Sequence, residues 1–379
     1  MKNFLRKNAY LLVLMVCLLM FSSGSASALD KPLPPVPPVI KEMKMLQGSD
    51  TFSIMNPTFS KDGKYLAAFF NGEKTIRIYD TSTGEVVAEL TQNILYNDKY
   101  VDGMAFTGEN NDQLIIMRAE APLKVLNWKD KTLNKELDLG VTGMKITDFA
   151  FTPDQKYLVI AKENGIDIWN YPESKKEKSF FDGQKINAVD ISSDGKYLIF
   201  AKAGKPKDSV GTIDLTTLDI GNMPLSNLPV DENNKLPDYE VHLVDFTNGH
   251  NTIAGYLNLP AGTFMPDGPA GVYLINTEKG SFSGPTSLSD FRLAMAKYLS
   301  PFRGVLTSSF NFGQGGKVTS SLDFINPMTM EKMKTYPSTE FKAPMLAINV
   351  SPDAKMMAAA LKEADGVKLY LFSLNMPQK

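Results

Sequence analysis

Only two histidines, His242 and His250, and one cysteine, Cys17, are available for the metal, haem and nucleophilic chemistry that these side chains usually carry. The histidines lie at opposite ends of a predicted strand, and five residues of strand separate those ends by roughly 16 Å. They therefore cannot bind one metal ion together, and two separated histidines make a Ser-His-Asp triad improbable. Covalent haem attachment needs a Cys-x-x-Cys-His motif, which the sequence lacks.

Aspartate recurs at one point of a repeated phrase, at Asp62, Asp154, Asp194 and Asp353. Each lies in a predicted hairpin turn, where a short acidic side chain accepts hydrogen bonds from nearby backbone N–H groups. Four equivalent copies favour a structural role over catalysis. The acidic stretch 229–240 does not have the ligand spacing of a calcium loop, and the Gly-rich stretch 313–317 lacks the following helix that would bind a phosphate. We therefore expect neither a metal nor a cofactor.

Residues 1–28 have the order of a secretory signal peptide. Three basic residues precede an apolar run from Ala9 to Phe21, and the small residues Ala26, Ser27 and Ala28 follow it. The run is shorter than the roughly 20 residues that span a bilayer, and Cys17 lacks the preceding small residue of a lipoprotein signal. We expect cleavage near Ala28 and a periplasmic or secreted chain with no lipid anchor and no insertion into the membrane.

The expected mature chain begins with a proline-rich linker, residues 29–38, and is acidic. Loss of residues 1–28 removes three cations and no acid from totals of 40 Lys plus Arg and 42 Asp plus Glu. This charge balance disfavours a nucleic-acid partner, because binding to phosphates depends on Lys and Arg. Prolines make the linker stiff and extended, so it would act as a spacer before residues 39–379.

A repeated phrase predicts the architecture of residues 39–379. FSKDGKYLAAFF from Phe59, FTPDQKYLVIAK from Phe151 and ISSDGKYLIFAK from Ile191 each indicate a strand, a tight turn and a second strand. Weaker copies begin at Phe106, Phe246, Leu299 and Val350. The seven copies lie 40 to 55 residues apart, which is typical of an array of structural repeats.

A third strand follows each copy, as in IRIYD from Ile76, and six copies continue into a fourth, more polar strand. Four strands at this period form the blade of a β-propeller. We therefore expect an all-β fold of seven four-stranded antiparallel blades. The seventh copy ends before a fourth strand, and the alternating segment from Val39 to Leu46 can supply that strand and close the ring.

The repeated phrases resemble the WD40-like propellers of bacteria, with the TolB-type and YVTN-type branches the most similar. The resemblance rests on SPD, SKDGKYL and SSDGKYL, and on Tyr79-Asp80 and Trp169-Asn170 at the ends of third strands. It covers residues 40–375 and implies the fold rather than an activity. No Gly-His dipeptide precedes a first strand, so the Asp-His-Ser/Thr-Trp hydrogen-bond network of eukaryotic WD40 proteins is not expected.

Polar residues are concentrated in turns and loops rather than in one convergent cluster, and this pattern favours a binding or scaffold protein. We expect a non-enzymatic propeller that mediates protein–protein interaction in the cell envelope, as a monomer or as a subunit of a complex. The alternative is a propeller enzyme of the lactonase or quinoprotein type that acts on a small molecule at the channel mouth. Such an enzyme needs convergent acidic or amide side chains, or a cofactor-stacking tryptophan, but Trp128 and Trp169 lie in third strands and are expected to pack between blades.

The expected partner site lies on one face, over blades four to six, because the loops there are the longest. In a propeller, the connections between blades open on the same face as the loops between second and third strands. The long segments on that face are about 226–240, 260–269 and 309–317. Aromatic and Arg side chains dominate binding energy at many interfaces. The candidate residues for binding another envelope protein are Asp231, Glu232, Tyr239, Phe264, Arg303, Phe310 and Phe312.

Overall fold

Strands make up nearly all of the regular structure, as the runs of aromatic, β-branched and small apolar residues predict. The computed structural model describes residues 33–49, 54–91, 95, 101–118, 121–137, 145–204, 209–221, 239–247, 251–258, 270–288, 292–312, 318–341 and 343–378. The chain divides into residues 1–34 and 35–379, and the fold belongs to the second unit. In the part of the chain that is described, no helix is long and apolar enough to cross a membrane.

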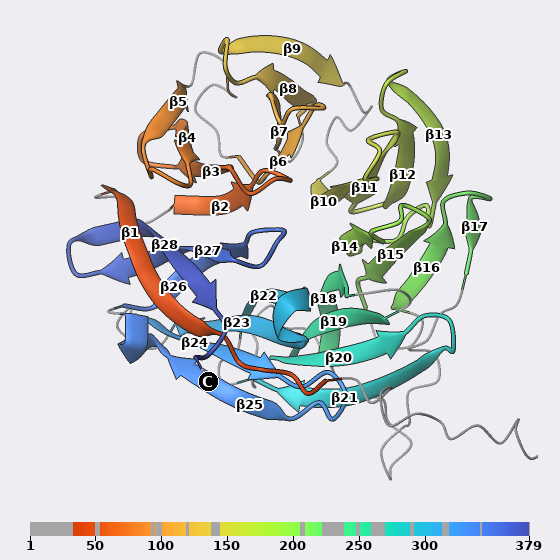
Figure 1. Ribbon diagram of the computed structural model, residues 1–379. Helices are drawn as coiled ribbons and strands as arrows, with labels where there is room; N and C mark the ends of the chain where they lie inside the picture. Colours follow the sequence, from red (N-terminus) through yellow and green to blue (C-terminus); the bar gives the residue numbers. More distant parts are fainter. Residues whose placement is uncertain are drawn as a thin grey trace, which may run out of the picture. The chain divides into compact units, whose positions relative to one another are not determined.

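Residues 35–379 form seven four-stranded antiparallel sheets, arranged in a ring as the blades of a propeller (Figure 1). The predicted fold class is therefore confirmed. First strands surround the centre of the ring, at β2 (Ile54–Phe59), β6 (Gly103–Thr107), β10 (Ile146–Phe151), β14 (Ile186–Ile191), β18 (Tyr239–Phe246), β22 (Arg292–Leu299) and β26 (Met345–Val350). Each of the seven anchor residues ends a first strand or, for Phe106, lies one residue before its end.

The other three strands follow outward in chain order in blades one to six, whereas in blade seven β27 and β28 are followed by β1. Second strands are β3 (Tyr65–Phe70), β7 (Gln113–Met117), β11 (Tyr157–Lys162), β15 (Tyr197–Lys202), β19 (Asn251–Asn258), β23 (Gly304–Phe312) and β27 (Met356–Glu363). Third strands are β4 (Thr75–Asp80), β8 (Leu123–Asn127), β12 (Gly165–Asn170), β16 (Val210–Asp214), β20 (Gly271–Asn276), β24 (Val318–Ile325) and β28 (Gly366–Asn375). Outermost strands are β5 (Val86–Leu90), β9 (Thr132–Leu137), β13 (Lys175–Phe180), β17 (Asp219–Ile220), β21 (Ser281–Ser287), β25 (Lys332–Pro337) and β1 (Val39–Ser49).

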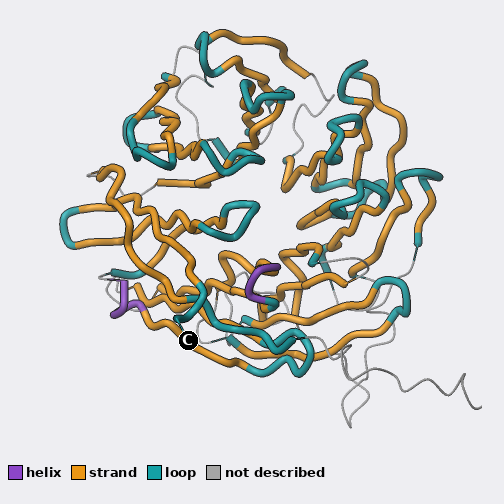
Figure 2. The backbone as a smooth tube through the Cα atoms, in the orientation of Figure 1, coloured by secondary structure: helices purple, strands orange, loops and turns teal. Residues whose placement is uncertain are grey.

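Neighbouring blades pack face to face, and this packing explains why the second strands are apolar on both faces. In β3, Phe69 packs in the cluster between blades one and two, while Phe70 packs in the cluster between blades seven and one. Outermost strands have a solvated side, and in β13 only Phe180 is buried. Trp128 lies directly after third strand β8 rather than in it, and it contacts Tyr65 across a blade boundary, with ring centroids 4.9 Å apart, as expected for a residue that packs between blades. Figure 2 shows how strands and short turns make up the ring.

Strand β1 is the fourth strand of blade seven and so joins the two ends of the ring. It pairs antiparallel with β28 from Val39 opposite Asn375 to Ser49 opposite Val367. The Tyr336 hydroxyl donates a hydrogen bond to the Pro38 carbonyl oxygen and fixes the entry to this strand. The predicted closure by an N-terminal strand is therefore present, and the strand runs three residues beyond the predicted end at Leu46.

The repeated aspartates shape the turns between first and second strands. In blade four, the Asp194 carboxylate accepts hydrogen bonds from the Ser192 hydroxyl at 2.7 Å and the Lys196 N–H at 3.1 Å. Ser192 Oγ in turn accepts the Tyr197 N–H at 2.9 Å. The same bonds recur at Asp62, Asp154 and Asp353. The hydroxyl and backbone donors lower the pKa of Asp194, so its carboxylate is a structural acceptor, as the sequence predicts.

The antiparallel order of the strands gives the ring two distinct faces. Turns between first and second strands open on one, which we name the hairpin-turn face. The connections between blades and the loops between second and third strands open on the other, which we name the connection face. First strands therefore begin at the connection face and end at the hairpin-turn face.

Candidate binding site at the channel mouth

The seven expected partner residues are only in part described. Asp231, Glu232 and Phe264 lie outside the described residues, and Tyr239 and Phe312 are described as strand ends without their side chains. Two candidates, Arg303 and Phe310, remain to be placed. Partner binding by all seven residues stays a prediction.

Arg303 lies in the turn between the first and second strands of blade six. It follows a short 3-10 helix, η2 (Ser300–Phe302), and its backbone is left-handed, with φ of 55°. We expected Arg303 among the loops of the connection face, but this turn opens on the hairpin-turn face. The copy of the repeat that begins at Leu299 already predicts a hairpin turn here, so the assignment of Arg303 to the loops of the connection face was wrong. Arg303 is thus separated from the other candidates.

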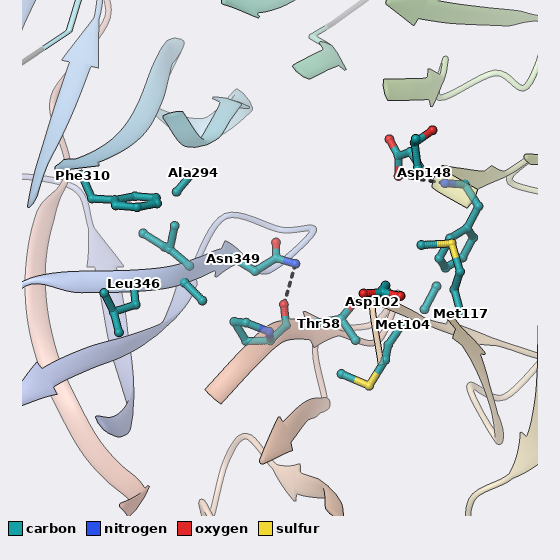
Figure 3. Close-up of a pocket in the computed structure, with 16 residues that line it drawn as sticks. Thr58, Asp102, Met104, Met117, Asp148, Ala294, Phe310, Leu346 and Asn349 are labelled. Carbon is teal, nitrogen blue, oxygen red and sulfur yellow. Dashed lines mark hydrogen bonds between the residues drawn. The ribbon is translucent and has the colours of Figure 1, made fainter. Parts of the chain in front are cut away.

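Phe310 lines a pocket of about 430 Å³ in the central channel (Figure 3). The 16 lining residues come from blades one, two, three, six and seven. Many of them lie at the starts of first strands, such as Gly103 in β6 and Thr147 in β10, while Met117 ends β7. Because first strands begin, and second strands end, at the connection face, the pocket opens at the channel mouth on that face. It extends along the channel to Thr58 and Asn349, near the ends of β2 and β26.

The pocket has two chemically different sides. Figure 3 shows Phe310, Ala294 and Leu346 of blades six and seven on one side. Opposite them are the side chains of blades two and three, with Asp102, Met104, Met117 and Asp148 labelled. Apart from Asn349, the first side is apolar, and the second carries both of the pocket's carboxylates. Among the lining residues there is no Lys, Arg or His.

Asp148 bridges two blades at the edge of this pocket. Its Oδ1 accepts the N–H of Phe149 at 2.8 Å, and its Oδ2 accepts the N–H of Val189, in β14 of the next blade, at 3.0 Å. Burial raises the pKa of Asp148 to about 6, because the loss of water outweighs these two donors. The carboxylate is therefore ionised at pH 7 but close to the pH at which it takes up a proton.

The same kind of bridge recurs around the channel, and the sequence analysis missed it. Asp190 Oδ2 accepts the Phe246 N–H at 2.7 Å, and Asp245 Oδ2 accepts the Tyr298 N–H at 3.3 Å. Both aspartates lie directly before the last residue of a first strand, in VDI and VDF. The sequence signal for this bridge is an acidic residue directly before the last residue of an apolar first strand. These carboxylates hold neighbouring blades together.

Burial shifts the pKa values of both Asp190 and Asp245, and Asp245 also acts on Asp190. Burial, and next the negative charge of Asp245, raise the pKa of Asp190 to about 7. Burial likewise raises the pKa of Asp245, although the Lys297 ammonium, 3.9 Å from its Oδ1, opposes the shift. The bridge between blades four, five and six is thus sensitive to pH near neutrality.

The histidines offer no metal site among the described residues. His242 lies in β18, with its Nε2 3.8 Å from a Glu240 carboxylate oxygen, and burial lowers its pKa. His250 lies outside the described residues. Over the described ranges, no group of three or more His, Cys, Asp or Glu side chains is placed to hold a metal ion.

Comparison with known proteins adds no assignment to this geometry. Neither the models of known protein families nor the curated proteins match this sequence. The seven-bladed fold is shown by the structure, while membership of the bacterial WD40-like propellers stays a prediction. Function must therefore be argued from the site itself.

Proposed function

We propose that this chain is a non-enzymatic binding propeller of the cell envelope, exported by its N-terminal signal peptide, that engages a protein partner at the connection face. The observation that supports this proposal best is the pocket at the channel mouth. It brings Phe310, a residue selected from the sequence as a partner-binding aromatic, into a concave site built from five blades. Concave sites with apolar walls and few polar groups are typical binding sites.

The use of the channel carboxylates favours binding over catalysis. Asp148, Asp190 and Asp245 each accept a backbone N–H from the next blade. A general base or nucleophile must instead be directed at a bound substrate within hydrogen-bond reach. Carboxylates engaged in holding the ring together supply shape and charge to the channel, which are properties that a binding protein uses.

The proposed partner surface extends from the pocket over the connection face of blades four to six. It includes Asp231, Glu232, Tyr239, Phe264 and Phe312, the candidates that follow from the loop lengths. Phe310 connects the two parts, because it lies two residues before the end of β23, the strand that leads to the connection face. The partner is expected to be another envelope protein.

An affinity pull-down tests this proposal. The chain without residues 1–28 is immobilised and exposed to envelope extract of its own organism, beside a Phe310→Ser variant and a Phe282→Ser control. Phe282 is a half-buried aromatic in outermost strand β21, so the control makes the same change away from the connection face. A partner captured by the native chain and the control, but lost by Phe310→Ser at a similar melting temperature, supports the proposal.

Two outcomes would contradict it. If the native chain captures no protein reproducibly, the binding function is wrong. If Phe310→Ser keeps the partner, the site is wrong. A metal ion or small molecule that co-purifies in stoichiometric amount would instead favour the enzyme of lactonase or quinoprotein type.

A further inference from the structure

We infer that residues 35–38 act as a latch that controls the opening of the ring at β1, because they tie the start of this strand to blade six. We name these residues, with the sequence PVPP, the proline latch. The inference concerns the closure of the ring, so it is independent of the proposed binding function. It follows from the hydrogen bonds, the composition and the burial of the latch.

Strand β1 is joined to its blade in a different way from the other outermost strands. In blades one to six, the outermost strand follows its partner strand directly in the chain, whereas β1 pairs with β28 from the opposite end of the sequence (Figure 1). It can therefore separate from blade seven while β26, β27 and β28 keep their order. Proteins open locally in such units at a lower free energy than that of complete unfolding. Contacts at the ends of β1 then determine how often this strand opens.

Two hydrogen bonds tie the latch to blade six. The Val36 N–H donates to the Phe302 carbonyl oxygen at 2.9 Å, in the turn between β22 and β23. The Tyr336 hydroxyl, in β25, donates to the Pro38 carbonyl oxygen. Phe302 and Tyr336 are 2% and 1% exposed and belong to the apolar cluster between blades six and seven, against which Ile40 of β1 also packs. The latch therefore joins blade six to the strand that completes blade seven.

The composition of the latch makes its single N–H decisive. Proline has no backbone N–H. Positions 34, 35, 37 and 38 are prolines, so Val36 is the only backbone donor from 34 to 38. Prolines also fix φ, and a residue before proline is restricted to extended conformations. The latch is thus largely ordered before it docks, and docking costs less conformational entropy than it would for a flexible segment.

Burial shows where the latch begins. Leu33 is 68% exposed, residues 35–37 are half-buried, and Pro38 is buried. Burial therefore increases along the chain toward β1. Farther along β1, the Lys44 ammonium donates a hydrogen bond to the Thr83 carbonyl oxygen of blade one. Strand β1 thus has a contact with each neighbouring blade, and the latch supplies the contact at its start.

Hydrogen–deuterium exchange, followed by mass spectrometry of the chain without residues 1–28, tests the inference. Peptides that cover β1 report on its opening. Peptides that cover β13 are the internal control, because this outermost strand belongs to blade three, which borders neither blade six nor blade seven. Val36→Pro removes the N–H donor, and the matched control Val36→Ala keeps it. Tyr336→Phe removes only the hydroxyl donor of the second hydrogen bond.

We expect Val36→Pro and Tyr336→Phe each to speed exchange in β1 about two- to tenfold, which corresponds to the net contribution of one hydrogen bond. Val36→Ala should change this exchange less than about twofold, because the N–H remains. Exchange in β13 should stay the same in all variants. Loss of either bond releases the whole latch, so the double variant should exchange no faster than the faster single variant.

Three results would overturn the inference. If Val36→Pro and Val36→Ala exchange alike in β1, the N–H bond does not hold this strand. If the effects of Val36→Pro and Tyr336→Phe multiply in the double variant, the two bonds are separate contacts rather than one latch. If exchange in β13 increases as much as in β1, the whole fold is destabilised and β1 does not open by itself. Tyr336→Phe removes a single oxygen atom, so it tests the latch even if Val36→Pro does not fold.

Discussion

Replacing Asp190 by Asn should remove a large part of the pH dependence of folding near neutrality. In the folded chain, burial and the nearby Asp245 carboxylate raise the pKa of Asp190 to about 7 from its ordinary value of 3.8. The folded state therefore holds a proton that the unfolded state releases. A raised pKa contributes stability that is fully present below pH 3.8 and is progressively lost as the pH rises through about 7.

The magnitude follows from linkage between proton binding and unfolding. Between about pH 5.5 and pH 7.5, a group with these two pKa values changes the free energy of unfolding by about 2 kcal/mol, in favour of the lower pH. For a chain of this size the unfolding entropy is roughly 0.7 kcal/mol/K, so the melting temperature should be about 3 °C higher at pH 5.5 from this group alone. In the Asp190→Asn variant the side-chain amide oxygen can still accept the Phe246 N–H, so the bridge between the blades persists.

Calorimetric melting of both proteins at the two pH values measures this effect. The comparison with the variant is essential, because His242 has a lowered pKa. Its contribution to the stability of the protein is therefore lost as the pH falls, whereas the contribution of Asp190 is lost as the pH rises. The contribution of His242 is common to both proteins and cancels in the difference. If the native chain and Asp190→Asn show the same change of melting temperature with pH, Asp190 is ionised throughout this range and the reasoning about the buried bridge is refuted.

Three further predictions concern stability. Deleting Val39–Ser49 should lower the melting temperature by many degrees or abolish soluble expression, because β28 becomes an open edge; an unchanged melting temperature would show that β1 does not hold the ring. Asp194→Ala should lower the free energy of unfolding by about 1 kcal/mol in denaturant unfolding, because the hydrogen bonds of the turn are lost, and it should keep the pull-down partner. Loss of the partner at unchanged stability would mean that this turn is a partner-binding site. Asp167→Ala and Lys162→Met should each cost about 3 kcal/mol, because the Lys162 ammonium lies 2.5 Å from an Asp167 carboxylate that is 1% exposed. The double variant should cost much less than their sum, and additive costs would count against the pair.

The architecture could be predicted because its signals are local and repeated. Asp194 lies two residues after Ser192 and two before Lys196, so all the bonds of its turn fall within six residues of chain. Third strands such as β12 carry their own apolar pattern and end in an Asn that shapes the next turn. Seven copies of a local signal at a near-constant period leave few alternatives to a propeller.

The channel site could not be predicted in the same way, because it depends on contacts between blades. Asp148 and Val189 are 41 residues apart, and nothing near Asp148 in the sequence indicates which N–H it accepts. The pocket combines Phe310, near the end of β23, with residues of five first strands, and only the radial order of the strands brings these together. Arg303 shows a different problem, because the repeat copy that begins at Leu299 predicted its hairpin turn, but the residue was assigned to the loops of the other face.

Closure through β1 also bears on how the chain is made. Lys41 and Ser373 are paired although 332 residues separate them. Strand β1 is therefore synthesised first but stays unpaired until β28 has been synthesised. At about 5–20 residues per second, that wait is roughly 15–70 s. During it, the charges of Lys41, Glu42 and Lys44 help keep an unpaired strand from joining other chains. A nascent chain that stops before β28 cannot form this last contact, so the ring closes only on a product that has been synthesised to its final blade.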